Sequence, residues 1–167
     1  MIPTRASIAL AGSLLLAGGC STTPDAADLV AAQGGAGPAV SEAEAAAALL
    51  DYVGAVNGAL RSGDTDALAA MTGPRCPCRD LVALIEARSA DRGALVDASF
   101  DAGAVTVLAR RDRQARVRAH VSVSEYAVRN RDGLLLRTEP AQEYVATYTV
   151  RMVGDDRWRV VDVREVG

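Results

Sequence analysis

Two cysteines, Cys76 and Cys78, are the residues of this chain whose type and spacing most directly suggest chemistry. Pro77 separates them, and Arg75 and Arg79 flank the pair. A thiol near the start of a helix and beside arginines has a lowered pKa, so it is reactive when reduced. That reactivity favours a redox role. The stronger redox signal, however, is C-x-x-C within a thioredoxin-like βαβ order, which this sequence does not show.

Zinc binding and a structural disulfide are the other interpretations of this pair. Zinc takes four ligands, and the one histidine, His120, lies on a distant predicted strand. Cysteines two residues apart can place their Cα atoms within the span of about 4.4–6.8 Å that a disulfide tolerates. Closing so short a loop stabilises a fold by only about 1.6 kcal/mol in the chain-entropy model. We favour a structural disulfide that fixes the start of the following helix, with redox or intermolecular pairing and metal binding as the alternatives.

The third cysteine, Cys20, ends a typical export signal. Arg5 precedes an apolar run at residues 6–17 that is too short to span a bilayer. Residues 16–20, LAGGC, resemble the lipobox of bacterial lipoproteins. By that resemblance the signal peptide of residues 1–19 is removed, and the Cys20 sulfur receives a diacylglyceryl group with fatty acyl chains such as palmitate. Two acyl chains give stable attachment. We therefore expect an extracytoplasmic protein, lipid-anchored on the outer face of the cell membrane.

Composition divides the rest of the chain into a tether and a domain. Residues 20–40 comprise the lipidated cysteine and a tether rich in Ala, Gly and Pro, which is expected to be flexible. Residues 41–167 are the right length for one domain with one core. The formal net charge is −3 and lysine is absent from the sequence. Such a domain is poorly suited to phosphate backbones, so nucleic acid is excluded as a partner. We also expect no cofactor and no metal.

The first half of the domain reads as helical. Ser41 and Glu44 have the spacing of a capping box. Apolar residues then recur at helical spacing up to a C-terminal Gly63, namely Leu49, Leu50, Val53, Val56 and Leu60. Asp64 is expected to cap a short second helix. A third helix is expected to start near residues 78–80 and to use Leu81, Leu84 and Ile85.

The second half alternates with a period of two. Between residues 115 and 123, alanine and valine alternate with Arg116, Arg118 and His120, which predicts a strand with one solvated face. The phase slips near Glu125 and Tyr126, which predicts a β-bulge. Turn signals at residues 130–133 and 154–156 delimit further strands. The sequence therefore predicts an α+β domain with N-terminal helices packed on a strongly curved antiparallel sheet.

In this order of elements the chain resembles the NTF2-like (SnoaL-like) superfamily over roughly residues 41–166. The shared features are a long first helix, a break at residues 61–64 and a final run at residues 160–163 that follows Trp158. More narrowly, the chain is similar to an actinobacterial lipoprotein family of unknown function. The matching positions are Tyr52 with Asn57, the Gly-Asp-Thr break at residues 63–65, and Cys76 with Cys78. The resemblance implies a cone, often with a pocket at its open end, and no particular activity.

Four residues are candidates for such a pocket: Tyr52, Asn57, Tyr126 and Tyr148. Asn57 lies on an otherwise apolar helix face, where its amide must find hydrogen bonds. We favour a neighbouring backbone group over a ligand as its partner. His120 is expected at the surface. We therefore assign no catalytic residue.

Two functions of different class remain open. In the first, the domain is a non-catalytic binding or scaffold module of the cell envelope, whose partner is an envelope protein or a small apolar ligand. In the second, it is a small-molecule enzyme of the isomerase or hydrolase type. A carboxylate with a raised pKa in the pocket would favour the enzyme. A monomer and a homodimer are both compatible with the charged outer sheet face.

Overall fold

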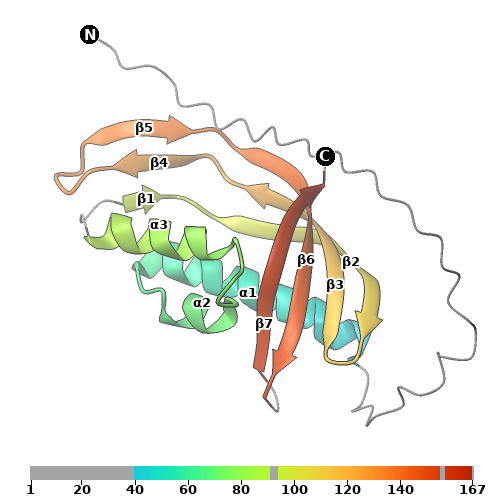
Figure 1. The fold of residues 1–167 in the computed structure, drawn as a ribbon. Coiled ribbons are helices and arrows are strands. Elements are labelled where there is room, and N and C mark those ends of the chain that lie inside the picture. Colours follow the sequence, from blue (N-terminus) through green and yellow to red (C-terminus); the bar gives the residue numbers. More distant parts are fainter. Residues whose placement is uncertain (1–39, 91–93, 155–156, 167) are drawn as a thin grey trace, which may run out of the picture. The chain divides into compact units, whose positions relative to one another are not determined.

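The computed structural model describes residues 40–90, 94–154 and 157–166, which form helices first and antiparallel strands after them (Figure 1). The signal peptide, Cys20 and the tether up to residue 39 lie outside the described residues. The helices are α1 (Glu42–Ser62), α2 (Asp66–Met71) and α3 (Arg79–Ala90). The strands are β1 (Ala94–Val96), β2 (Phe100–Arg111), β3 (Gln114–Val123), β4 (Tyr126–Arg129), β5 (Leu135–Glu139), β6 (Gln142–Val153) and β7 (Arg157–Val166). The predicted α+β class is confirmed.

Helix α1 begins and ends as its sequence predicts. The Ser41 hydroxyl accepts from the Glu44 N–H at 3.1 Å, and the Glu44 carboxylate accepts from the Ser41 N–H at 2.8 Å. These bonds hold the pKa of Glu44 below its ordinary value. At the other end Gly63 adopts φ 74°, a left-handed conformation that suits glycine, and donates to the Ala59 carbonyl. Among the described helices, none is long and apolar enough to cross a membrane.

Two details of the helical prediction are wrong. Leu50 is 49% exposed, because adjacent helix residues lie about 100° apart and Leu49 takes the core-facing position. In α3 the buried residues are Val82 and Ile85, whereas Leu84 faces solvent. Although Thr65 directly precedes α2, the Asp64 carboxylate accepts from the Asp66 N–H at 3.0 Å and so caps the first turn, as expected.

The strands form two antiparallel sheets, with strand orders β1-β4-β5 and β2-β3-β6-β7. Along the chain β1 is followed directly by β2, β3 by β4, and β5 by β6. At each of these three points the chain passes from one sheet to the other. Figure 1 shows the resulting bent surface, with the helices on its concave side. The alternation of side chains slips at Glu125 because the chain passes there from one sheet to the other, so the predicted β-bulge at that point is wrong.

Ser124 forms hydrogen bonds across this bend. The Ser124 hydroxyl donates to the Asp97 carbonyl at 2.6 Å and accepts from the Ser99 N–H at 2.9 Å. The Ser124 N–H also donates to the Ser99 carbonyl at 3.0 Å. The segment between β1 and β2 and the segment between β3 and β4 thus pair their polar groups with each other. The chain can bend there without leaving those groups unpaired.

The core lies between α1 and the concave face of the four-stranded sheet. Leu49 and Leu68 are fully buried there against the inward valines of three strands, Val117, Val121, Val150 and Val160. The inward residues of β3 are alanine and valine, and such small side chains let the sheet approach the helix closely. Arg116, Arg118 and His120 lie on the exposed outer face, as their alternation predicts.

Candidate functional site

An apolar cavity of about 230 Å³ lies at one end of this core. Its wall comes from α1, the segment entering α3, and strands β2, β6 and β7. The lining residues are Tyr52, Val53, Val56, Pro77, Cys78, Leu81, Phe100, Tyr144, Tyr148 and Val163. Helix α1 supplies the first three at helical spacing, whereas Tyr144 and Tyr148 share the inward face of β6.

Three tyrosines supply the polar groups of this cavity. The rings of Tyr52 and Tyr148 lie 6.4 Å apart at a tilt of 56°, within the usual range of aromatic pairs. Burial raises the pKa of Tyr52 to about 12; Tyr144 nearby adds to the rise, and a hydrogen bond with Thr72 opposes it. Burial likewise raises the pKa of Tyr148 and of Tyr144. All three phenols therefore stay neutral near pH 7 and can donate or accept a hydrogen bond.

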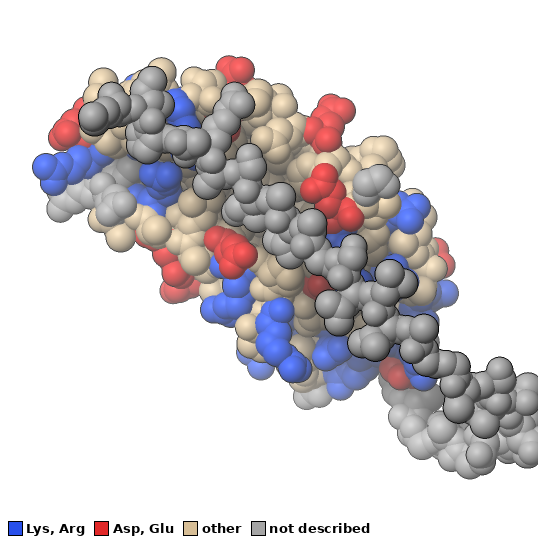
Figure 2. Space-filling model, turned by 45° about the horizontal axis from the view of Figure 1, so that its top comes forward, with Lys and Arg blue, Asp and Glu red and all other residues tan. Residues whose placement is uncertain are grey.

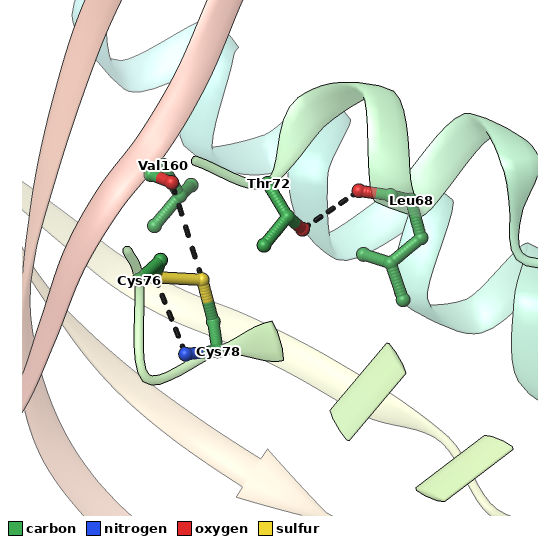
Figure 3. The surroundings of a disulfide bond; sticks show 5 residues. All are labelled: Leu68, Thr72, Cys76, Cys78 and Val160. Atoms are coloured by element: carbon green, nitrogen blue, oxygen red, sulfur yellow. Dashed lines mark hydrogen bonds between the residues drawn. A yellow bond between two sulfur atoms is a disulfide. The ribbon is translucent and has the colours of Figure 1, made fainter. Parts of the chain in front are cut away.

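A disulfide forms part of the cavity wall. Cys76 and Cys78 are bonded, with their Cα atoms 5.1 Å apart (Figure 3). Cys76 is buried, and Cys78 faces the cavity. The Cys78 N–H contacts the Cys76 sulfur at 3.2 Å, and the Cys78 sulfur lies 4.0 Å from the Val160 carbonyl oxygen. The bridge thus closes the turn that leads into α3 and lies in contact with β7.

The segment before the disulfide is fastened to the same strand. The Gly73 N–H donates to the Val160 carbonyl at 2.8 Å, and Thr72 forms a parallel bridge with Val160. The Thr72 hydroxyl donates to the Leu68 carbonyl at 2.7 Å, as Figure 3 shows. A methyl group on Gly73 would lie 3.1 Å from backbone atoms of β7, so this close approach suits glycine.

Asn57 binds the backbone and does not line the cavity. Its Nδ2 donates to the Phe100 carbonyl at 2.8 Å, and its Oδ1 accepts from the Phe100 N–H at 2.8 Å. This two-point bond fixes the first residue of β2 to α1. Phe100 in turn presents its side chain to the cavity. Asn57 therefore positions a wall residue.

The four candidate pocket residues thus separate into two pairs. Tyr52 and Tyr148 line the cavity, whereas Asn57 and Tyr126 do not. Sequence reasoning missed Phe100, Leu81 and Val163 as lining residues. Each belongs to a different element, and the sequence carries no signal that these elements meet at one point. The sequence also indicates Tyr144 as a possible lining residue, because it shares a strand face with Tyr148, and the structure places it in the wall.

The lining residues limit the chemistry of the site. None of the described residues around the cavity is Asp, Glu or His. A tyrosine with a raised pKa holds its proton, so it is a poor general base at neutral pH. Within the described ranges, no group of three or more His, Cys, Asp or Glu residues is arranged to hold a metal ion. The arrangement is therefore suited to binding an apolar molecule that carries a small polar group.

The remaining surface is polar and mixed in charge. Figure 2 shows basic and acidic side chains interspersed over the face in view. A larger hollow of about 540 Å³ lies where the end of α1 faces β1, with Arg61, Arg88 and Asp97 in its wall. The described wall of this hollow mixes guanidinium, carboxylate and hydroxyl groups, so it is less apolar than the cavity. The tyrosine-lined cavity is therefore the better candidate.

The sequence matches no protein-family model and no curated protein sequence. Its structure resembles the intermembrane space region of the chloroplast protein ARC6, with a TM-score of 0.56 and 11% identity over 78% of this chain and 99% of that one. A ketosteroid isomerase-like protein from Erwinia carotovora atroseptica gives 0.47 and 16% identity, over 77% and 99%. The TM-score above 0.5, to the ARC6 region, shows a shared fold. A protein with a cystatin-like fold from Caulobacter vibrioides gives 0.47 and 13%, over 72% and 86%. Identities this low concern the fold alone.

Proposed function

We propose that the protein is a non-catalytic binding module of the cell envelope, whose cone takes up a small apolar ligand. The observation that carries this proposal is the make-up of the cavity: apolar side chains with neutral tyrosine hydroxyls and no carboxyl or imidazole group among its described lining residues. A volume of about 230 Å³ is below the usual range for drug-sized ligands. The ligand class is therefore a single aromatic ring or a short branched chain with one hydroxyl or carbonyl group.

The alternative, an isomerase or hydrolase, needs a group that moves protons near pH 7. The NTF2-like fold hosts enzymes and binding proteins alike, so the fold does not decide between them. The wall of this cavity supports the binding module.

The pocket proposal is tested with two tryptophan variants of α3. Leu81→Trp fills the cavity, whereas Leu84→Trp places the same ring on the exposed side of the same helix. The probe is 4-fluorophenol, a small ring with one hydroxyl, observed by ¹⁹F NMR. We expect saturable binding to the unmodified chain and to Leu84→Trp, and binding at least about tenfold weaker to Leu81→Trp. Equal binding to both variants, or no saturable binding to the unmodified chain, would contradict the proposal.

The second part of the proposal concerns location. We propose that Cys20 carries a diacylglyceryl group that anchors the chain on the outer face of the cell membrane. The LAGGC segment at residues 16–20 supports this, as does the order of Tyr52, Asn57, the Gly-Asp-Thr break and the cysteine pair, which resembles an actinobacterial lipoprotein family. A disulfide between the remaining cysteines is consistent with an oxidising compartment. Partner proteins and the oligomeric state stay predictions.

Anchoring is checked by fractionating cells that produce the full chain or its Cys20→Ala variant. The unmodified protein should sediment with membranes and show, by intact mass, two or more acyl chains. Cys20→Ala should lack that added mass and lose the lipid anchor. An unmodified Cys20 thiol in the purified protein would refute this part.

A further inference from the structure

Three consecutive leucines lie exposed at the end of the hairpin formed by β4 and β5. Leu134, Leu135 and Leu136, here called the leucine tip, are 64%, 48% and 54% exposed. Strand β5 is an edge strand of the three-stranded sheet and pairs with β4. Figure 1 shows that this hairpin extends past β1. A contiguous run of large exposed apolar side chains indicates a contact surface.

The exposure of these leucines favours a fluid partner. The register between β4 and β5 shifts at Leu136, because Arg129 pairs with Leu135 and Val128 pairs with Arg137. The alternation of side chains is therefore interrupted within the tip. All three side chains are nevertheless at least 48% exposed, and a lipid surface that the tip enters end-on covers all of them, whichever face each one occupies.

The turn of the hairpin, from Asn130 to Leu134, has its own backbone hydrogen-bond partners. The Asn130 side-chain oxygen accepts from the Asp132 N–H at 3.0 Å and from the Leu134 N–H at 2.9 Å. The Asn130 N–H donates to the Leu134 carbonyl at 3.0 Å, and an Arg129 guanidinium N–H donates to the Gly133 carbonyl at 2.7 Å. Because unpaired backbone groups oppose entry into lipid, this internal pairing makes shallow entry easier.

Charges around the tip suit anionic headgroups. Residues 129–139 carry three arginines, Arg129, Arg131 and Arg137, against Asp132 and Glu139. Arg131 lies 3.8 Å from Asp132, Arg137 pairs with Glu139, and the two guanidinium groups remain more than half exposed. Arginine can lay its aliphatic stem along an apolar surface while its charged end reaches the headgroups.

The described chain begins at the end of α1 that lies away from the leucine tip. Val40, where the described chain begins, donates its N–H to Asp112 in the turn between β2 and β3, beside the start of α1. Strand β1, which pairs with β4, lies instead beside the end of α1. Helix α1 is 21 residues, or about 32 Å, long. The nineteen residues between Cys20 and Val40 can span up to about 65 Å when extended, so the anchor leaves the tip free to reach the bilayer.

We propose that the leucine tip docks into the surface of an anionic lipid bilayer and gives the protein a second membrane contact. The position of this bilayer rests on the proposed lipid anchor at Cys20. Because the anchor already holds the domain near the membrane, weak affinity of the tip is sufficient for docking.

The test uses the lipidated chain in vesicles of phosphatidylglycerol and phosphatidylcholine. A polarity-sensitive fluorophore is attached at Asp132→Cys in the tip or, as the matched control, at Ala67→Cys on the exposed side of α2. Vesicles containing nitroxide-labelled lipid should quench the tip fluorophore at least about threefold more than the control fluorophore. Adding Leu134→Ser, Leu135→Ser and Leu136→Ser together should abolish that difference. The unfolding midpoint should not move, because these side chains are exposed.

Other outcomes separate this inference from the anchor. Equal quenching at both positions in the lipidated chain overturns the tip contact while the anchor stands. If Cys20 proves unmodified, a chain beginning at Ser21 should still fold, since its core is drawn from residues 40–163. Because the unanchored tip binds weakly, leucine-dependent quenching should then appear with the same vesicles at a higher lipid concentration. Failure there also overturns the inference. A blue shift at Asp132→Cys that needs no lipid and grows with protein concentration assigns the tip to a second copy of the chain and overturns it too.

Discussion

Replacing Asn57 by alanine is expected to lower the free energy of unfolding by about 3 kcal/mol. The substitution removes both bonds to Phe100 and leaves that residue's N–H and carbonyl without their partner in a half-buried position. Each buried polar group left unpaired costs about 1–3 kcal/mol. Urea denaturation followed by circular dichroism measures the loss. A loss below about 1 kcal/mol would mean that water replaces the amide and that the clamp contributes little.

Asn57→Asp refines the same test through pH. An aspartate keeps the acceptor for the Phe100 N–H, but it can donate to the Phe100 carbonyl only when protonated. The carboxyl pKa should therefore lie above its ordinary value of about 3.9 in the folded state. A raised folded-state pKa gives stability that is present below the unfolded value and lost as the pH rises. The variant should approach the unmodified chain below about pH 4 and fall behind it towards pH 7. A deficit independent of pH would contradict the two-point bond.

The same clamp should affect the cavity. Phe100 forms part of the wall, and Asn57 fixes its backbone to α1. Stability and 4-fluorophenol binding should therefore fall together in Asn57→Ala. A destabilised variant that binds unchanged would show that the Phe100 side chain holds its place without the amide.

Leu49→Ala is the second large effect that we expect, with a loss of about 3 kcal/mol. Leu49 is fully buried between α1 and the sheet, so truncation removes apolar contact and leaves a cavity. Buried leucine-to-alanine changes cost about 2–5 kcal/mol. The neighbouring residue supplies the control, because Leu50 is 49% exposed and Leu50→Ala should change stability by less than about 0.5 kcal/mol. Thermal and urea unfolding of the two variants measure the contrast. Similar losses in both would show that the helix face is assigned wrongly.

The leucine tip and the cavity place two apolar features at different sites of the domain. If the tip lies in the membrane surface, the tyrosine cavity is held near lipid, where apolar molecules concentrate. Ligand uptake would then depend on the tip as well as on the cavity wall. The triple serine variant in vesicles distinguishes these contributions, because its cavity residues are unchanged.

Local features were predictable from the sequence because they depend on near neighbours. The capping box of Ser41 and Glu44 and the ending of α1 at Gly63 involve residues three or four positions apart. The alternation along β3 directly predicts which side chains face water, since strand residues alternate between the two faces. The spacing of Cys76 and Cys78 likewise permits a disulfide without knowledge of the fold.

Only the tertiary structure decided what meets at the cavity. Asn57 and Phe100 are 43 positions apart, and no local pattern marks the amide as the partner of that strand. After Val123 the chain passes from one sheet to the other. In the sequence this passage looks like a β-bulge, because both disturb the alternation of side chains in the same way. Leu49 and Leu50 are chemically identical, and only the position of the sheet determines which one is buried. The sequence by itself therefore determined the elements and the α+β class, whereas long-range packing determined the site, because its walls come from five separate segments of the chain.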